Sequence, residues 1–417
     1  MVSFPRGSLR GTIAVPADKS ISHRALILQA FARGAFAIEN LNPGADVLAT
    51  QRALHALDPS FDRLRMTPDE RRGAVCEIAC MNSGSTARML LGVCAGANVH
   101  ARFDGDASLR RRPMEPVAAQ LRAFGARIET ADGHLPLEIF GCERIQTRRF
   151  ILLSPSAQVK SALLFAGLFA GVQIGIAGDA GSRDHTERLL RYQGAQISWS
   201  GKGADFAAPP SRFKNLRIAG DFSAAAFFIT AATIAPGSEL TIRDVGVNPT
   251  RTGLLDALRL MGADIELREE RELCGEPIAD VLVRHAGLHG VAIERDLALR
   301  AIDEIPLLAV AAAFAHGETT IAGIGDLRTK ESDRIAAIQG LLGATGIASR
   351  ATPTSIVIAG GRPEADGTLA RSHDDHRIAM AAAVLACAAG PIELDDASSV
   401  DVSFPEFLAT LRQTREP

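Results

Sequence analysis

The sequence has few cysteines, and they do not form pairs. Its 417 residues contain six cysteines and no CxxC motif. At this density we expect no disulfide framework, but free and mostly buried thiols in a reducing cytosol. These cysteines are Cys76, Cys80, Cys94, Cys142, Cys274 and Cys387.

The chain also lacks a surplus of basic charge and any long apolar run. Its net charge is −3, which argues against a general nucleic-acid or membrane-surface partner. The longest apolar stretches, residues 305–315 and 378–389, are too short to cross a bilayer. The first residues show no apolar signal-peptide region. We expect a cytoplasmic monomer that binds small molecules, with neither nucleic acid nor membrane as a partner.

Motifs for common cofactors are missing as well. No Walker A pattern occurs, and neither GSRDH nor MNSGSTAR matches the glycine spacing of dinucleotide-binding folds. The sequence therefore favours neither ATP nor a nicotinamide cofactor.

An internal repeat of about 70 residues is the main pattern present. Six times, an Ala-rich apolar segment ends in glycine and a β-rich run follows. A polar cluster lies fourteen residues before each glycine. We read each unit as a capped, buried helix, a glycine C-cap and then a strand. The glycines are Gly34, Gly96, Gly171, Gly237, Gly317 and Gly390, and the positions fourteen residues earlier are Ser20, Asn82, Ala157, Ser223, Asp303 and His376.

Six units in one chain suggest two domains of three units each. The shortest joins without predicted elements fall near Ala17 and Gly220. We therefore expect one domain of residues 18–220 and another of residues 1–17 plus 221–417, with the active site in the cleft between them.

Several predicted helix starts carry cations, although helix N-termini favour negative charge. These cations are Lys19, Arg24, Arg88, Lys160 and Arg377. Further basic residues lie in RRRP (110–113) and KESDR (330–334). Each alone is typical of a solvated surface charge, but their repetition favours sites for anions. Arginines could hold phosphates and carboxylates there in bidentate fashion.

Two acidic residues could serve acid–base chemistry beside such anions. Asp303 lies at a predicted helix start, and Glu331 follows in the next polar loop. A lone Asp at such a position is more often only a cap. HDDH (373–376) has metal-ligand residue types, but Arg377 would repel a cation, so we favour capping over metal.

In this order, the motifs resemble those of the enolpyruvyl transferases, and in particular the branch that acts on shikimate 3-phosphate. The motifs are DKSISHR, NSGSTAR, RRRP, PSAQVKS, SRDHTE, GDFSAAAFF, IDEIP, KESDR and DHRIAM. The resemblance implies an α/β (α+β) fold of two similar globular domains, each made of three βαβαββ units with buried helices. It implies transfer of the enolpyruvyl group of phosphoenolpyruvate to the 5-hydroxyl of shikimate 3-phosphate, without metal or organic cofactor.

The resemblance also assigns roles to residues. For catalysis it implies Asp303 as proton acceptor, Glu331 as the acid for the methylene carbon, and Lys19. Around shikimate 3-phosphate it implies Lys19, Ser20, Arg24, Ser156, Ala157, Gln158, Ser182, Asp303 and Lys330. Around phosphoenolpyruvate it implies Lys19, Gly84, Arg112, Gln158, Arg334 and Arg377.

Two positions depart from the family pattern. Met81 stands where the family has glycine before the asparagine, and Val402 where some relatives have lysine. The alternatives are the sister enzyme that acts on UDP-N-acetylglucosamine and a non-catalytic anion-binding scaffold. The sister enzyme carries a cysteine at the position of Ala107, and this chain has no cysteine between Cys94 and Cys142.

Overall fold

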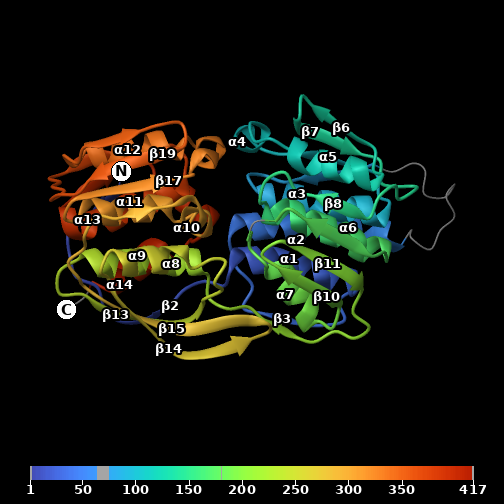
Figure 1. Cartoon of the computed structure of the whole chain (residues 1–417), viewed down its shortest axis with the longest axis horizontal. Helices are drawn as coiled ribbons and strands as arrows, with labels where there is room; N and C mark the ends of the chain where they lie inside the picture. Colours follow the sequence, from blue (N-terminus) through green and yellow to red (C-terminus); the bar gives the residue numbers. More distant parts are fainter. Residues whose placement is uncertain (1, 63–74, 180, 416–417) are drawn as a thin grey trace. The chain divides into compact units, whose positions relative to one another are not determined.

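The chain folds into two compact units. The computed structural model describes residues 2–62, 75–179 and 181–415, except for the side chains of residues 58–62 and 402. Unit 1 comprises Met1–Asp18, Ala219–Leu273 and Pro277–Pro417, and unit 2 comprises Lys19–Ile218 and Cys274–Glu276. Figure 1 traces the chain from blue to red through both units.

The described part of unit 2 consists of helices with short strands between them. Its helices are α1 (Lys19–Phe31), α2 (Ala45–Asp62), α3 (Gly84–Ala97), α4 (Ala107–Arg110), α5 (Glu115–Phe124), α6 (Ala157–Ala170) and α7 (His185–Tyr192). Its strands are β3 (Ile38–Glu39), β4 (Cys76–Ala79), β5 (Ala101–Asp104), β6 (Ile128–Ala131), β7 (His134–Ile139), β8 (Arg149–Ile151), β9 (Ile174–Ala177), β10 (Gln196–Ser200), β11 (Gly203–Ala208) and β12 (Leu216–Arg217).

Unit 1 is built in the same style. Its helices are α8 (Phe222–Ile234), α9 (Gly253–Leu260), α10 (Arg295–Arg300), α11 (Ile305–Ala313), η2 (Gly325–Thr329), α12 (Arg334–Gly343), α13 (His376–Ala389), η3 (Ser398–Val402) and α14 (Phe407–Gln413). Its strands are β1 (Val2–Phe4), β2 (Arg10–Ala14), β13 (Glu239–Gly246), β14 (Asp264–Leu273), β15 (Glu276–Arg284), β16 (Ala292–Ile293), β17 (Glu318–Ala322), β18 (Ser349–Ala351), β19 (Ser355–Ala359), β20 (Thr368–Ala370) and β21 (Ile392–Leu394).

One sheet pattern recurs in four repeats. The strand orders are β4-β5-β7-β6, β10-β11-β9-β8, β14-β15-β13-β2 and β16-β17-β19-β18. In each sheet the first two strands along the chain pair in parallel, and a buried helix lies in the segment between them. A hairpin adds the other two strands. This is the βαβαββ unit, which confirms the α/β fold class that the resemblance implies.

Unit 2 is inserted into unit 1 between the two parallel strands of one repeat. Strand β2 precedes unit 2 in the sequence, and its parallel partner β13 follows unit 2. Arg10 is opposite Glu239, so the pairing joins residues more than two hundred positions apart. Each unit therefore has its own sheets and its own core, although the chain passes between the units more than once.

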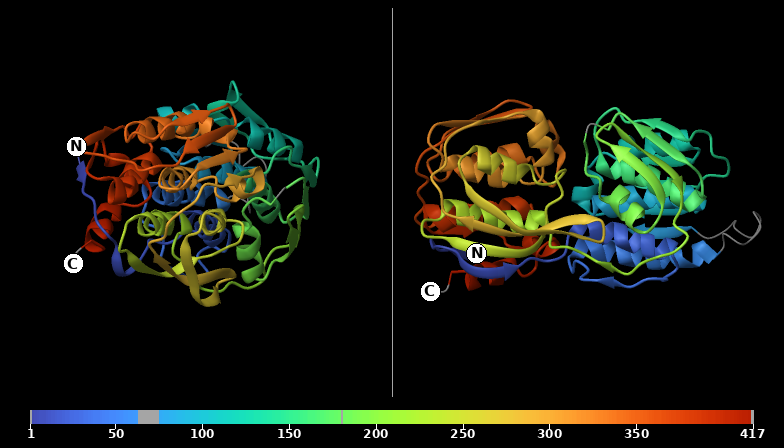
Figure 2. Two further views of the ribbon diagram at one scale, coloured as in Figure 1. Left: turned by 60° about the vertical axis from the view of Figure 1, so that its left-hand side comes forward. Right: turned by 60° about the horizontal axis from the view of Figure 1, so that its bottom comes forward.

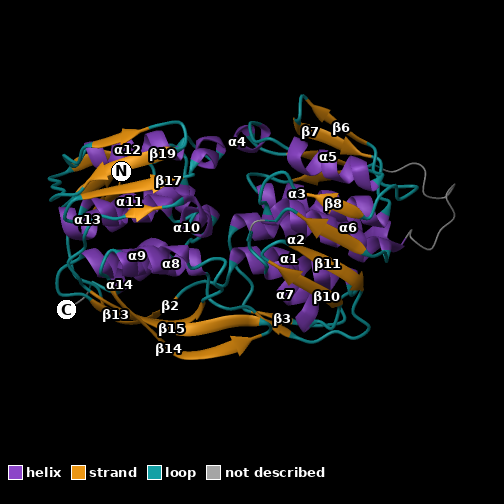
Figure 3. Cartoon of the chain, in the orientation of Figure 1, coloured by secondary structure: helices purple, strands orange, loops and turns teal. Residues whose placement is uncertain are grey.

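The Ala-rich segments form central helices that are buried nearly all round, as their sequences predict. Every residue of α8, α11 and α13 is buried, and these three helices pack against one another in unit 1. In unit 2, α3 packs against both α1 and α6. Figure 2 shows the helices of each unit lying side by side, and Figure 3 shows strands outside them. Small alanine side chains permit this close packing.

The glycine caps are only partly as predicted. Gly171 and Gly390 are the C-caps of α6 and α13. Gly34, Gly237 and Gly317 lie a few residues beyond the last helical residue, each at positive φ. The prediction for Gly96 is wrong, because this residue lies inside α3 and Asn98 in left-handed conformation ends the helix.

The cysteines are free, as expected, but only half of them are buried. Cys80, Cys94 and Cys387 are buried, and the other three are partly exposed. Within the described residues, no helix has the length and apolar character needed to cross a membrane.

Gly92 and Gly96 are where α3 touches α6. A Cβ at Gly92 would lie 2.0 Å from the carbonyl oxygen of Ala162, and a Cβ at Gly96 would lie 2.3 Å from that of Ala166. Neither contact involves a flexible side chain that could move away. The role of Gly96 is therefore close helix packing, which explains a glycine at this point of the repeat without a cap.

We predict that Gly92→Ala lowers the free energy of unfolding of unit 2 by about 1–3 kcal/mol, the usual cost of overpacking a core. Urea unfolding followed by the fluorescence of Trp199, the single tryptophan, reports on unit 2. The matched control is Gly340→Ala in α12, where an added Cβ meets open space. Urea unfolding followed by far-UV circular dichroism should show no loss of stability in this variant. Equal stability of the two variants would contradict the packing argument.

Candidate active site

In unit 2, side chains from the starts of three helices meet in one polar network. Ser83 caps α3 and Ser156 caps α6, each accepting a backbone N–H bond three residues on. Gln158, in the first turn of α6, donates to Ser85 Oγ at 3.0 Å and accepts from Arg88 at 2.8 Å. The starts of α3 and α6 are thus joined, and Ala157 is the first residue of α6.

Arg24 links the start of α1 to α6 and to the start of α7. Its guanidinium donates to the carbonyl oxygen of Ser20 at 2.8 Å, to Thr186 Oγ1 at 2.7 Å and to Ser161 Oγ at 2.9 Å. Arg24 is buried, so these bonds hold its charge in a fixed position. Lys19, in the first turn of α1, is half-buried and lies 2.9 Å from Asp46 Oδ2.

Arg112 and Gly84 lie beside the start of α3. Arg112 donates to Asn82 Oδ1 at 2.6 Å and to Ser108 Oγ at 3.2 Å, and it is buried. Gly84 is the first residue of α3, and an added Cβ there would lie 2.7 Å from the Arg88 guanidinium. A methyl group at this position would therefore displace Arg88 rather than meet backbone.

Met81 adopts a left-handed backbone. Its φ is 53°, a region that glycine reaches without steric cost. This explains in physical terms why a glycine suits this position, and Met81 carries the strain instead. Its side chain is exposed. The side chain of Val402, the second departure, lies outside the described residues.

Lys160 does not face an anion site, contrary to the prediction from helix starts. It is 2 % exposed and pairs with Asp179 and Glu187, each at 2.7 Å. Burial lowers its pKa, but the two carboxylates raise it further, and the net shift is upward. Its ammonium also donates to the Ser182 carbonyl oxygen at 3.3 Å. Lys160 therefore holds Asp179 and the Ser182 carbonyl in place. The Oγ of Ser182 is buried without a hydrogen-bond partner among the described residues.

His23 is a buried titratable residue that the motif analysis did not single out. Its Nδ1 lies 2.7 Å from Thr50 Oγ1, and Thr50 lies 2.6 Å from Thr86 Oγ1. Its Nε2 is buried and unpartnered within the parts of the chain that the structure describes. Burial lowers its pKa to about 3, with Asp46 opposing the shift. The imidazole is therefore neutral and adds no charge to the network.

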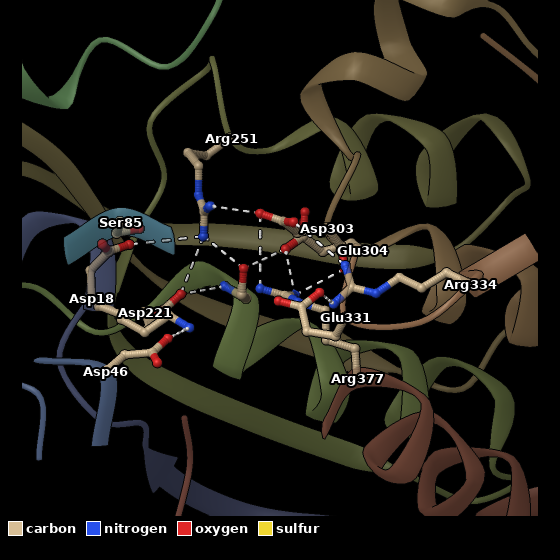
Figure 4. A network of polar contacts seen from close by, with 12 residues as sticks. Asp18, Asp46, Ser85, Asp221, Arg251, Asp303, Glu304, Glu331, Arg334 and Arg377 are labelled. Carbon is tan, nitrogen blue, oxygen red and sulfur yellow. Dashed lines mark hydrogen bonds and ion pairs between the residues drawn. The ribbon is translucent and has the colours of Figure 1, made fainter. Parts of the chain in front are cut away.

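In unit 1, Arg334 contacts three carboxylates, two of which, Asp303 and Glu331, are seen beside it in Figure 4. It is the first residue of α12 and is 1 % exposed. It donates to Asp375 at 2.8 Å and to Glu331 at 2.6 Å, and it lies 3.8 Å from Asp303. Although burial raises the pKa of Asp375, Arg334 outweighs this effect and the net shift is downward.

Asp303 lies among three arginines. Its carboxylate is 3.8 Å from Arg251, 3.8 Å from Arg334 and 3.9 Å from Arg377. Its side chain is 17 % exposed, so bound molecules can reach it. Arg377 also donates to the backbone carbonyl oxygen of Asp303 at 2.9 Å. The structure thus brings Asp303 and Glu331 to the same guanidinium, that of Arg334, and Lys330 is the residue before Glu331.

The HDDH segment caps a helix, as predicted. Asp375 is the N-cap of α13 and accepts the backbone N–H of Arg377 at 3.0 Å. Its carboxylate also accepts hydrogen bonds from Arg334 and, at 3.0 Å, from Ser332 Oγ.

Three residues of these networks were not found from the sequence. They are Asp46, Asp221 and Arg251, which contact the predicted residues directly or through one side chain. Glu304 adjoins Asp303 in IDEIP, and its carboxylate accepts a hydrogen bond from Ser223. Arg251 lies in a loop outside the repeat positions, so the helix-start pattern could not reveal it.

Comparison with known proteins points to one family. The profile of EPSP synthase (3-phosphoshikimate 1-carboxyvinyltransferase) matches residues 5–411. A 3-phosphoshikimate 1-carboxyvinyltransferase of Desulforudis audaxviator is 46% identical, with 99% of this chain and 98% of that protein covered. One of Alkalilimnicola ehrlichii is 43% identical, with 97% and 93% covered.

Solved structures agree with this result. EPSP synthase from Acinetobacter baumannii is 33% identical, with a TM-score of 0.81 over 99% of this chain and 98% of that one. The enolpyruvyl transferase NikO from Streptomyces tendae is 16% identical, with a TM-score of 0.69 over 99% and 96% of the two chains. At that identity, NikO supports the fold alone.

We predict that His23 makes unit 2 less stable in mild acid. Its pKa is lower in the folded state than in the unfolded chain, so the unfolded state binds the proton first as the pH falls below about 6.5. Between pH 7 and pH 5 this costs about 2 kcal/mol. Urea unfolding followed by Trp199 fluorescence should show this extra loss in the wild type and not in His23→Gln. Parallel pH curves would refute a neutral buried His23.

Proposed function

This chain belongs to the EPSP synthase family, and we propose that it transfers the enolpyruvyl group of phosphoenolpyruvate to the 5-hydroxyl of shikimate 3-phosphate and releases phosphate. This transferase reaction is a step of chorismate and aromatic amino acid biosynthesis. We place it in the cytoplasm and in a monomer. The observation that carries the proposal is the Asp303 carboxylate among three arginines, with Glu331 bound to one of them.

The reaction requires two proton transfers. The sugar-like hydroxyl must lose a proton as it attacks C2 of the enol, and the CH₂ carbon must gain one. In our proposal Asp303 accepts the first proton, with Lys330 beside the hydroxyl, and Glu331 supplies the second. Loss of phosphate from the tetrahedral adduct then completes the transfer. Fixed cations stabilise the charge that develops on the leaving phosphate.

The helix starts supply the groups that bind the two anionic substrates. For shikimate 3-phosphate we propose Lys19, Ser20, Arg24, Ser156, Ala157, Gln158, Ser182, Asp303 and Lys330. For phosphoenolpyruvate we propose Lys19, Gly84, Arg112, Gln158, Arg334 and Arg377. Supporting this assignment, unpaired backbone N–H groups at helix starts bind anions well. The arginines are already held by neighbouring side chains, so binding needs little ordering.

One assay tests the substrate. Phosphate release from phosphoenolpyruvate should occur with shikimate 3-phosphate and not with UDP-N-acetylglucosamine, the acceptor of the sister enzyme. Ala107, at the first position of α4, cannot supply the cysteine of that enzyme. Release with the nucleotide sugar alone would reverse the assignment, and release with neither acceptor would favour a non-catalytic scaffold.

We predict that Asp303→Asn keeps the fold and substrate binding but lowers kcat by a factor on the order of 10²–10⁴, the usual effect of losing a positioned base. Circular dichroism checks the fold, and calorimetry with shikimate 3-phosphate checks binding. Near-normal turnover in the folded variant would remove Asp303 from this role.

We also predict that both units contribute to phosphoenolpyruvate binding. Arg112→Gln in unit 2 and Arg377→Gln in unit 1 should each raise its KM by roughly ten- to a hundredfold, because each removes a charged hydrogen-bond donor. The matched controls are Arg127→Gln and Arg350→Gln, whose side chains are each 70% exposed in surface ion pairs. If only one unit's variant changed the KM, the proposed division of ligands would be wrong.

A further inference from the structure

Arg251 is a buried arginine that none of the proposed substrate contacts uses. It is 3 % exposed and lies in the turn NPTRTG, directly before α9. Burying a guanidinium is costly unless partners compensate its charge. Burial lowers its pKa, yet the surrounding carboxylates, first of all Glu304, outweigh this effect and raise it. The protein therefore keeps a permanent cation at this point of unit 1.

The contacts of Arg251 connect it to the proposed base by two routes (Figure 4). One terminal nitrogen lies 3.8 Å from the Asp303 carboxylate. The other donates to Ser223 Oγ at 2.7 Å, and Ser223 in turn donates a short hydrogen bond to Glu304, the neighbour of Asp303. The same nitrogen donates to Asp221, the N-cap of α8, at 3.3 Å.

Backbone contacts hold the turn that carries Arg251 in place. Asn248 O accepts the N–H of Arg251 at 2.8 Å, which closes the turn. A Cβ at Gly253, the first residue of α9, would lie 2.7 Å from the backbone nitrogen of Ala301. The loop that carries Arg251 is thus in direct backbone contact with the turn that leads to Asp303, and only glycine allows this approach.

Removal of Arg251 would leave several buried carboxylates without their cation. Four carboxylates surround it, and two of them, Asp18 and Glu304, are buried. The carboxylate of Asp18 lies 3.9 Å from the Arg251 guanidinium, and the side chain of Glu304 has no exposure. Without Arg251, Asp303 would keep two neighbouring cations, Arg334 and Arg377. The negative charges of Asp18, Asp221 and Glu304 would then be less well neutralised. Like charges favour protonation of a carboxylate, and a protonated carboxylate cannot act as a base.

We propose that Arg251 is a positioning residue for the reaction: it orients the Asp303 carboxylate and keeps it ionised, and through Ser223 it fixes Glu304 beside it. This inference rests on the proposed function of Asp303. It predicts an effect on turnover and on its pH dependence, with little effect on substrate affinity.

Two substitutions separate charge from geometry. Arg251→Lys keeps a cation but cannot reach both Asp303 and Ser223, so kcat should fall about ten- to a hundredfold with the acid limb of its pH profile unmoved. Arg251→Met removes the cation, so the acid limb should move up by about one pH unit or more, the usual effect of losing an opposite charge at this distance. Both KM values should stay within about threefold of the wild type.

This profile depends on the charged groups that contact Asp303 or one of its arginine partners: Arg251, Arg334, Arg377, Asp18, Asp221, Glu304, Glu331 and Asp375. The control is Arg284→Met, which removes an arginine of unit 1 paired with Glu239 on β13 at 2.9 Å, away from the turn that carries Arg251. Its kcat and pH profile should equal those of the wild type. If Arg251→Met fails to fold by circular dichroism, the result for Arg251→Lys decides.

A double-mutant cycle tests whether Arg251 acts through Asp303. In the Asp303→Asn background, Arg251→Lys should lower kcat no further, because the group that it positions is already gone. Full additivity of the two losses would overturn the proposal, as would wild-type kcat in folded Arg251→Lys or a loss confined to KM. A wild type that releases no phosphate with shikimate 3-phosphate would instead overturn the proposed function, and with it this inference.

Discussion

Burial of the central helices on every side is the constraint on which both units depend. Within such a helix no charged side chain can reach water, so charged groups are confined to its two ends. In unit 1, α8, α11 and α13 are fully buried, and charged residues lie at or just before their starts. These residues are Asp221, Asp303, Glu304, Asp375 and Arg377. The repeat fold therefore places charged groups from distant parts of the sequence close together.

The two units use this arrangement differently. In unit 2 the shared polar groups are mainly hydroxyls, amides and cations, with Arg24 and Arg88 joining the helix starts. In unit 1 the carboxylates predominate, and Arg251, Arg334 and Arg377 offset them. In our proposal the first set holds anions, whereas the second moves protons and also contributes Arg334 and Arg377 to phosphoenolpyruvate binding.

Sequence reasoning located the helix starts because the repeat spacing reflects real helix lengths. It brought Asp303, Glu331, Arg334 and Arg377 into one candidate site, and the structure places all four in one cluster. It failed where tertiary packing decides the role of a residue. Gly96 in a repeat position is a helix contact rather than a cap, because α6 passes too close for any side chain.

For Lys160 and Arg251 as well, tertiary contacts decide what the charged side chain does. Lys160 has the sequence position of an anion ligand, but Asp179 from a later loop and Glu187 from α7 pair with it and neutralise its charge. Arg251 has no periodic signal, since it comes from a turn between a strand and a helix. A single sequence shows where a cation lies along the chain, but it does not show which carboxylates fold against it.

In our proposal, helix starts in unit 1 and helix starts in unit 2 bind the two substrates. Amide hydrogen exchange can be compared with and without shikimate 3-phosphate plus phosphoenolpyruvate. We expect slower exchange at the first turns of α1, α3 and α6 in unit 2 and of α11, α12 and α13 in unit 1, with no change at their C-terminal ends. Protection confined to the C-terminal ends, or none at saturating substrate, would contradict it.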